Sequence, residues 1–377
     1  MTSAFDVCPR CARRSWLLGR LAPNLEIVRG ERRVIREVLS LSDADLAHAL
    51  APNDARSLLR EASDLRASSL LAAWAAASTG GICRHADDYP ERLRQLPDAP
   101  AVLHMVGDRT RLPALLAGDA RTAAIVGSRR ASDAGIQIAV DLGRGLSAAG
   151  VTVVSGMALG IDAAAHRGAL EARDRTVAVL ACGPERAYPA SKRGLHDALR
   201  ERALVLSELP PGTRPYRWAF PARNRIIAAL GDMTVIVEAA ERSGSLITSE
   251  IALELGRDVG AVPGRPSSWS AAGANALLRD GARVVRGASD VIEDLIGLDV
   301  GGIARPHVVV AALPIPEGLG ETLTGLLFGI DDGRDTVAAL AGERPGDVGG
   351  LLGGLSELEL LGHVRRVEGG RYVRARP

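Results

Sequence analysis

This chain of 377 residues has few cysteines and aromatic residues, a net charge close to zero and no long apolar run. Its four cysteines are too few and too scattered for the disulfide framework of a small secreted protein. A net charge of +1 excludes a chain-wide field that would attract a polyanion, so any nucleic-acid site must be a local patch. No run of 18 apolar residues occurs, and the first residues form no apolar signal core. We therefore expect the protein to be located in a reducing cytoplasm.

The sequence contains one C-x-x-C pair, Cys8-Pro9-Arg10-Cys11, and no second pair. A zinc site would need two more ligands, for which Cys83 and His85 are the only nearby candidates. Because the set is half complete, we predict no metal site, and metal binding by Cys8 and Cys11 is kept as the alternative. We also predict no cofactor.

Four regions follow one another along the chain. Residues 1–86 favour helices, with Ser42 as a predicted N-cap, and form a small N-terminal module. Residues 87–300 form an α/β region, 301–317 a linker containing glycine and proline, and 318–377 helices followed by a hairpin. Helices before a short terminal hairpin predict a winged helix.

From about Ala123, short apolar strands alternate with helical stretches. This alternation predicts a doubly wound, mostly parallel sheet of the α/β class. Such a sheet binds ligands beyond the carboxyl ends of its strands, at the point where the strand order reverses. The predicted strands are Ala123–Gly127, Val151–Ser155, Thr176–Ala181, Leu204–Ser207, Met233–Glu238 and Val259–Val262. Ser132 is the predicted N-cap of the helix that follows the first of these strands.

Glycine and hydroxyl residues follow several of these strands. Backbone N–H groups and hydroxyls in such loops can receive a phosphate, although the same glycines could simply form tight turns. No dinucleotide fingerprint and no Walker loop is present, so nothing supports a nucleotide cofactor. The loops include Gly127-Ser128-Arg129, Ser155-Gly156 and Ser243-Gly244.

The stretch 213–225 combines four arginines with three of the eleven aromatic residues. Guanidinium groups neutralise phosphates while rings stack on unpaired bases, so this composition favours a single-stranded nucleic acid. We expect Tyr216, Trp218 and Phe220 to stack. The alternative is an arginine-rich surface loop whose rings pack into the core.

A hydrolase is the competing class. Ser155 and Ser243 lie in glycine-flanked loops, and His166 follows Asp162 by four residues, but neither serine lies in a G-x-S-x-G motif. Asp162 and His166 could equally be a polar pair within a helix. We predict no catalytic residue and no enzyme activity.

Residues from about Tyr89 to Ile296 resemble the DprA/Smf family, the DNA-processing proteins of natural transformation. The ordered series of short motifs carries the resemblance. It comprises Tyr89-Pro90, 124–129 (AIVGSR), 155–166 (SGMALGIDAAAH), Tyr188-Pro189, 220–225 (FPARNR), 243–248 (SGSLIT) and Pro263-Gly264. The resemblance implies an extended Rossmann-like domain that binds single-stranded DNA, dimerises and loads the RecA recombinase during DNA uptake and recombination. It also implies the helical N-terminal module and the C-terminal winged helix.

The resemblance also implies roles for single residues. Arg129 matches a phosphate-binding arginine and Phe220 a base-stacking phenylalanine. Arg217 falls at a basic position of the family, as Lys192 does near the Tyr-Pro pair, while Leu159 and Ser191 depart from the family pattern. The expected DNA-binding set is Gly127, Ser128, Arg129, Ser155, Gly156, Lys192, Arg217, Phe220, Arg223, Asn224, Arg225, Ser243 and Gly244. The alternative is a nucleotide-handling enzyme of the phosphoribohydrolase type, but its P-G-G-x-G-T-x-x-E loop is absent.

The tail lacks the residues that read duplex DNA. Its candidate recognition helix, Asp347–Leu361, contains no arginine, lysine or asparagine and carries Asp347, Glu357 and Glu359. We predict a role in protein contact or an accessory role for this part.

Overall fold

The computed structural model describes residues 4–26, 32–296, 319–331, 334, 336–337, 340, 348–367 and 371–375. The chain divides into two compact units, Met1–Asp299 and Val300–Pro377, which are described separately. The predicted linker, 301–317, lies outside the described residues. Within the described parts, no helix is both long and apolar enough to cross a bilayer.

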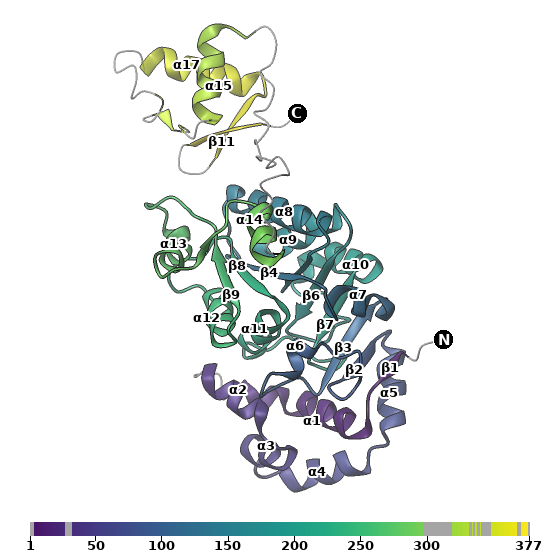
Figure 1. The fold of residues 1–377 in the computed structure, drawn as a ribbon. Coiled ribbons are helices and arrows are strands. Elements are labelled where there is room, and N and C mark those ends of the chain that lie inside the picture. The colour runs from purple at the N-terminus through teal and green to yellow at the C-terminus, as the bar shows by residue number, and fades with distance from the viewer. Residues whose placement is uncertain are drawn as a thin grey trace. The chain divides into compact units, whose positions relative to one another are not determined.

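A ten-stranded sheet forms the centre of the first unit, in the order β1-β2-β3-β7-β6-β5-β4-β8-β9-β10 (Figure 1). Strand β3 is antiparallel to both of its neighbours, β2 and β7, and the other described pairs are parallel. The fold is therefore α/β with a mostly parallel sheet, as the sequence predicts. The strands are β1 Phe5–Asp6, β2 Gly80–Cys83, β3 Val102–Gly107, β4 Thr122–Val126, β5 Thr152–Ser155, β6 Thr176–Leu180, β7 Leu204–Ser207, β8 Met233–Ile236, β9 Asp258–Ala261 and β10 Arg283–Val284.

All six strands predicted from the sequence are present, with ends that agree within two residues. Both faces of these strands are buried, so each reads as a continuous apolar run that is easy to find. Strands β1, β2, β3 and β10 were not predicted. Two of them are only two residues long, β2 begins with two glycines, and the buried His104 interrupts the apolar run of β3.

Helices cover both faces of the sheet. One face of the strands packs against α8 and α9, through residues such as Leu142, Leu146 and Ala165. The other packs against α11 through Ile226 and Leu230. The helices of this region are α6 Glu91–Arg94, α7 Leu112–Leu116, α8 Asp133–Ala148, α9 Ile161–Leu170, α10 Arg193–Arg202, α11 Ala219–Leu230, α12 Leu246–Glu254, α13 Ala272–Arg279 and α14 Ala288–Ile296.

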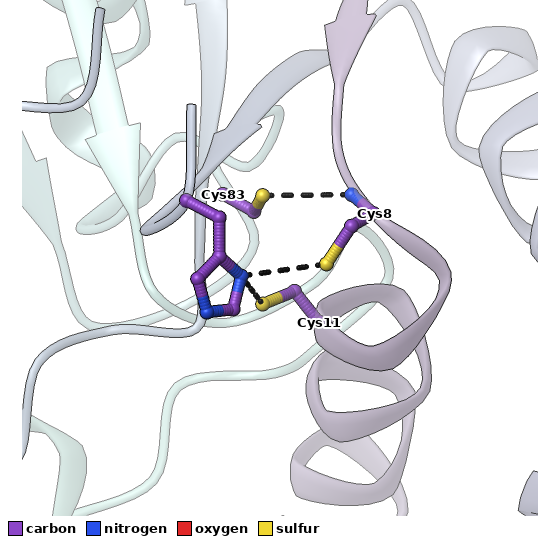
Figure 2. Close-up of side chains that lie close together, drawn as sticks. Cys8, Cys11 and Cys83 are labelled. Atoms are coloured by element: carbon purple, nitrogen blue, oxygen red, sulfur yellow. Dashed lines mark hydrogen bonds between the residues drawn. The ribbon is translucent and has the colours of Figure 1, made fainter. Parts of the chain in front are cut away.

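Among residues 4–26 and 32–86, the structure describes five helices and two strands. The helices are α1 Pro9–Leu25, α2 Arg32–Ser40, α3 Asp43–Leu50, α4 Ala55–Asp64 and α5 Ala67–Ala76. The predicted cap is confirmed, because the Ser42 hydroxyl accepts the N–H of Asp45 at the start of α3. Strands β1 and β2 join the central sheet, so this region is more than the helical module that the sequence predicts. Their pairing brings Cys8 and Cys11 close to Cys83 (Figure 2).

In the second unit, the described residues form two longer helices and an antiparallel hairpin. They are α15 Glu321–Asp331, α17 Val348–Leu360, β11 Val364–Val367 and β12 Arg371–Arg374. Leu327 and Leu358 form its small core together with Val364 and Tyr372 of the hairpin. Helix α17 carries Glu357 and Glu359 and no basic residue, and the exposed Arg365 and Arg366 lie on β11. The winged-helix assignment stays a prediction.

Candidate nucleic-acid interface

A hollow of about 600 Å³ opens at the carboxyl ends of β4 and β8. The chain runs from β4 through β5, β6 and β7 on one side of the sheet and then crosses to β8 on the other side of β4. The order of the strands reverses at this point, which is where open α/β sheets bind ligands. We call it the switch-point hollow. Its lining includes Gly127, Ser128, Arg129, Arg130, Asp162, Phe220, Arg223, Asn224, Arg242, Ser243, Gly244 and Trp269.

The loop after β4 is held by close backbone packing. Ser128 donates its N–H to the carbonyl of Glu238 at 2.7 Å, and the Ser128 carbonyl accepts the N–H of Ile161 at 3.2 Å. A Cβ at Gly127 would lie 2.7 Å from Cγ1 of Ile161, so only glycine fits there. Gly160, with φ at +78°, brings its backbone close to Ser128 as well. This packing fixes the exposed Arg129 at the edge of the hollow.

Glu238 does not place an unpaired negative charge in the hollow. Its carboxylate accepts the N–H of Ser132 at 3.1 Å and the Ser132 hydroxyl at 2.8 Å. The same hydroxyl caps α8 by accepting the N–H of Gly135, which confirms the predicted cap. Among the described residues that line the hollow, Asp162 is the one acid, and it is buried.

Arg129, Phe220 and Tyr188 form a continuous cationic and aromatic surface. The guanidinium carbon of Arg129 lies 5.1 Å from the centre of the Phe220 ring. The rings of Phe220 and Tyr188 lie 5.6 Å apart at an interplanar angle of 49°. These three residues also line a smaller cavity of about 90 Å³, together with Gly156 and Leu159. A base and its phosphate could contact this surface at the same time.

Arg223 is a buried structural neighbour of this surface. Its Nη1 donates to the carbonyl of Val179 at 2.6 Å, and its guanidinium lies so close to Gly156 that any side chain there would collide with it. Burial lowers the pKa of Arg223, while the nearby Asp162 carboxylate acts in the opposite direction. Asp162 accepts the N–H groups of Gly156 and Ala158, and burial raises the pKa of its carboxyl. Arg223 therefore supports the loop that carries Gly156.

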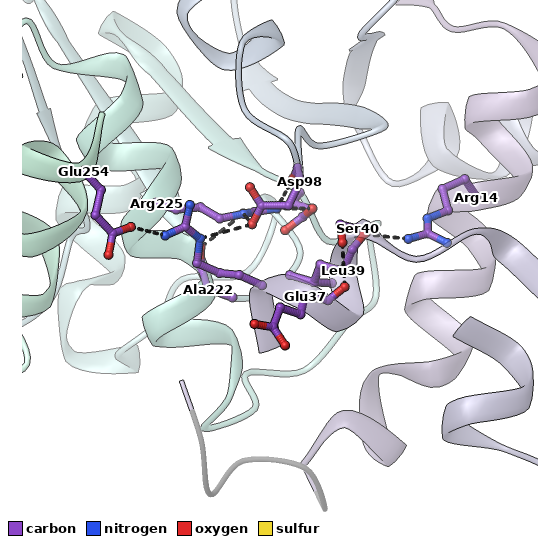
Figure 3. A network of polar contacts seen from close by, with 10 residues as sticks. Arg14, Glu37, Leu39, Ser40, Asp98, Ala222, Arg225 and Glu254 are labelled. Carbon is purple, nitrogen blue, oxygen red and sulfur yellow. Dashed lines mark hydrogen bonds and ion pairs between the residues drawn. The ribbon is translucent and has the colours of Figure 1, made fainter. Parts of the chain in front are cut away.

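Arg225 differs from its predicted role, because its side chain has no exposed surface. Its Nε donates to Asp98 at 2.7 Å (Figure 3). Its Nη2 donates to Glu208 at 2.7 Å. Burial alone would lower the pKa of Arg225, but these two carboxylates raise it. Asp98 also pairs with Arg36 of α2 at 3.5 Å, and Arg36 pairs with Glu254 at 2.7 Å. Arg225 thus joins α11 to the loop before β3 and to the end of β7, and through Asp98 to Arg36 of α2, rather than facing a ligand.

Trp218 also differs from the stacking role predicted for it. It is 1% exposed, and its Nε1 donates to the carbonyl of Ala22 in α1 at 2.9 Å. Tyr216 is partly buried and packs against the same core. Phe220 touches this core too, but it also lines both cavities. The rings of Trp218 and Tyr216 therefore pack into the core, as the second alternative predicts, whereas Phe220 also faces the cavities, and stacking of a base on it stays a prediction.

The loop after β8 contributes hydroxyl and amide groups. Asn224 donates to the carbonyl of Gly244 at 3.3 Å, which joins α11 to this loop. The hydroxyls of Ser243 and Ser245 lie 2.7 Å apart just before α12 begins. A Cβ at Gly244 would meet nothing within 4 Å, so the space above the loop is open.

Three other predicted residues lie outside both cavities. Ser155 is fully buried and donates its hydroxyl to the carbonyl of Ile125 at 2.6 Å. Lys192 ends a short 3-10 helix, and Arg217 is exposed beside Trp218. Ser155 differs from the predicted contact role because it has no exposed surface. Lys192 and Arg217 could contact a nucleic-acid strand only where that strand extends beyond the hollow.

Sequence reasoning missed two aromatic residues at this interface. Trp269 lines the switch-point hollow and is 79% exposed, which is unusual for so large an apolar ring. Tyr188 belongs to the Tyr-Pro motif but was not selected as a site residue. Trp269 follows the Pro263-Gly264 loop, and its place after a strand end is the signal that could have identified it.

The predicted acid–base candidates bond elsewhere. Asp162 bonds to backbone N–H groups, as described above, whereas Nδ1 of His166 is hydrogen-bonded to the Thr176 hydroxyl at 2.7 Å. Burial lowers the pKa of His166 to about 3, so this imidazole is neutral at physiological pH. The pair does not form an acid–base relay in this structure.

Comparisons with known proteins agree with this geometry. Residues 81–296 match the model of the DNA recombination-mediator protein A family. The chain is 38% identical to the DNA processing protein DprA of Bacillus subtilis over 226 residues, 60% of this chain and 74% of that protein. It is 41% identical to a putative DNA processing protein DprA of Mycobacterium tuberculosis over 275 residues, 72% of this chain and 68% of that one.

Solved structures of two DNA processing proteins are among those similar to this one. DprA from Streptococcus pneumoniae aligns with a TM-score of 0.60 and 31% identity, covering 77% of this chain and 99% of that one. DNA processing protein A from Helicobacter pylori, described for its single-stranded DNA binding mode, aligns with a TM-score of 0.52 and 29% identity. That alignment covers 58% of this chain and 96% of the other.

Proposed function

Since this chain belongs to the DprA/Smf family of DNA recombination-mediator proteins, we propose that it binds single-stranded DNA at the switch-point hollow. The observation that carries the proposal is the contact between Arg129 and Phe220 at the open edge of the hollow. A relative from Helicobacter pylori is described as binding single-stranded DNA, which supports the same ligand.

The proposed binding mode assigns different parts of the strand to different residues. Arg129 pairs with a backbone phosphate, with the exposed Arg130 and Arg242 nearby on the same hollow. An unpaired base stacks on Phe220 and Tyr188. The Ser243-Gly244 loop adds hydroxyl and N–H donors for a second phosphate. A duplex satisfies only the phosphate contacts, because its bases are stacked on one another.

The further roles are extensions of this proposal. The family resemblance implies that the chain passes the bound strand to RecA, that it acts as a homodimer and that it catalyses no reaction itself. We also propose that residues 1–86 serve as an N-terminal module and that residues 87–300 form the DNA-binding domain. The tail, 318–377, is proposed as a winged helix that contacts protein rather than duplex DNA.

Fluorescence anisotropy with labelled oligo-dT and a matched duplex tests the DNA site. We expect tighter binding of the single strand at fixed salt concentration, and equal affinities would contradict the proposal. Arg200→Ala is the matched charge control. Arg200 lies near Gly107, which pairs with the first residue of β7, so it is at the opposite edge of the sheet.

A nucleotide-hydrolysis assay tests the alternative enzyme class. We expect no turnover of nucleoside monophosphates. Reproducible hydrolysis that is abolished by Arg129→Ala would contradict the mediator function and would identify the protein as a nucleotide-handling enzyme.

A further inference from the structure

Three of the four cysteines of the chain converge with one histidine far from the switch-point hollow. The ligand atoms of Cys8, Cys11, Cys83 and His85 all lie within 4.8 Å of one another. Cys8 immediately precedes α1 and Cys11 lies in its first turn. Cys83 is the last residue of β2, and His85 follows in the next turn. Figure 2 shows Cys8, Cys11 and Cys83 around a common centre.

The spacing of these atoms fits a tetrahedral metal. Nδ1 of His85 lies 3.4 Å from Sγ of Cys8 and 3.3 Å from Sγ of Cys11. Around a zinc ion, with Zn–S of about 2.3 Å and Zn–N of about 2.0 Å, neighbouring ligand atoms in a tetrahedron are about 3.5–3.8 Å apart. Since all four ligand atoms lie within 4.8 Å of one another, small movements of the side chains would bring them to these distances. His85 presents Nδ1 to the cluster.

We propose that Cys8, Cys11, Cys83 and His85 form a structural Zn²⁺ site. Three thiolates and one imidazole are a donor set that zinc prefers, and four protein ligands leave no open position for catalysis. All four cysteines of the chain are free thiols, and a disulfide would use only two of the three in this cluster. The backbone N–H of Cys8 lies 3.5 Å from Sγ of Cys83, and such N–H···S contacts stabilise a metal-bound thiolate.

The burial of the ligands agrees with a structural role. Cys11 and Cys83 are 1% and 2% exposed, and they pack with Val102 of β3 in a small core. His85 is exposed, which leaves a path for the ion to enter. The site would fasten β1 and the start of α1 to the end of β2, two segments about 75 residues apart. Metal binding of this kind contributes directly to folding.

Metal analysis of the full-length chain, purified under reducing conditions without chelator, tests the proposal. We expect about one zinc ion per chain. Cys83→Ser and Cys11→Ser should reduce the zinc content to near zero. Cys182→Ser is the matched control, because Cys182 is the one cysteine outside the cluster, and it should retain zinc.

Two further measurements keep the proposal falsifiable if a cysteine variant fails to fold. His85→Asn removes an exposed ligand, so the fold should survive while a chelating dye extracts zinc more readily. Replacement of zinc by Co²⁺ in the natural sequence should give the visible absorption bands of a tetrahedral thiolate-bound ion. Failure of the reduced, full-length chain to bind either added Zn²⁺ or Co²⁺ would overturn the proposal.

Discussion

The guanidinium carbon of Arg129 lies 5.1 Å from the centre of the Phe220 ring, although the two residues belong to different elements of the fold. Arg129 is held by the loop after β4, and Phe220 lies in the first turn of α11. A cation over a ring is itself worth about 0.5–1 kcal/mol at an exposed site. The pair therefore holds a positive charge, on Arg129, close to a ring that a base can stack on, Phe220.

Phe220→Ala should weaken binding of oligo-dT by about 1–3 kcal/mol, because one base loses its stacking partner. The dependence of affinity on salt concentration should stay as in the natural sequence, since no phosphate contact is removed. Anisotropy titrations at several salt concentrations measure both quantities. An unchanged affinity would exclude Phe220 from the binding surface.

Arg129→Ala should weaken binding and also make it less dependent on salt. Loss of one phosphate contact on a single strand reduces the slope of log K against log[salt] by about 0.7. Arg200→Ala removes the same charge at the opposite edge of the sheet and should leave the slope unchanged. If the two variants behave alike, Arg129 makes no specific phosphate contact.

Arg225→Met should destabilise the fold rather than remove a DNA contact. The substitution leaves Asp98 and Glu208 without their buried partner, which costs about 3–5 kcal/mol. Chemical denaturation of the full chain measures this loss. Glu254→Gln breaks the exposed end of the same network and should cost less than about 1 kcal/mol, because its side chain is 61% exposed. A stable Arg225→Met protein would contradict the structural role.

Acid should destabilise the first unit through two buried histidines. Burial lowers the pKa of His104 and His166 from 6.5 to about 3. The unfolded chain binds protons at these positions below pH 6.5 and the folded chain does not, so stability falls as pH decreases from 6.5 toward 3. Each histidine contributes roughly 1 kcal/mol per pH unit in this range. His104→Gln should make denaturation midpoints less dependent on pH between 6 and 4, and an unchanged dependence would contradict the assignment.

Removal of residues 300–377 should leave the affinity for duplex DNA unchanged. The helix available to read a groove, α17, carries glutamates and no basic residue. Comparison of the full chain with residues 1–299 by gel shift measures the difference. A loss of duplex binding on removal would assign the tail a DNA-reading role.

The sequence predicted those parts of the fold that depend on neighbouring residues. The six buried strands and the caps at Ser42 and Ser132 have local signals, and each is present. The predicted loops after β4 and β8 also meet at one hollow, because parallel strands end at the same edge.

The parts that could not be predicted depend on distant partners. Arg225 resembles a DNA contact in sequence, but its partner Asp98 is 127 residues away and becomes visible only in the fold. Likewise, Trp218 finds its acceptor, Ala22, 196 residues away. The sequence offers Cys83 and His85 as possible partners of Cys8 and Cys11, but that the four residues meet depends on the pairing of β1 with β2.

The antiparallel strand β3 has a consequence for any attempt to divide the first unit. It lies between β2 and β7 and hydrogen-bonds to both. A chain cut near residue 86 would lose β2 and leave one side of Val102–Gly107 with unpaired N–H and C=O groups. Such an open strand edge is a template for the pairing of one molecule with another, and it promotes aggregation. The N-terminal residues therefore protect the rest of the unit from self-association.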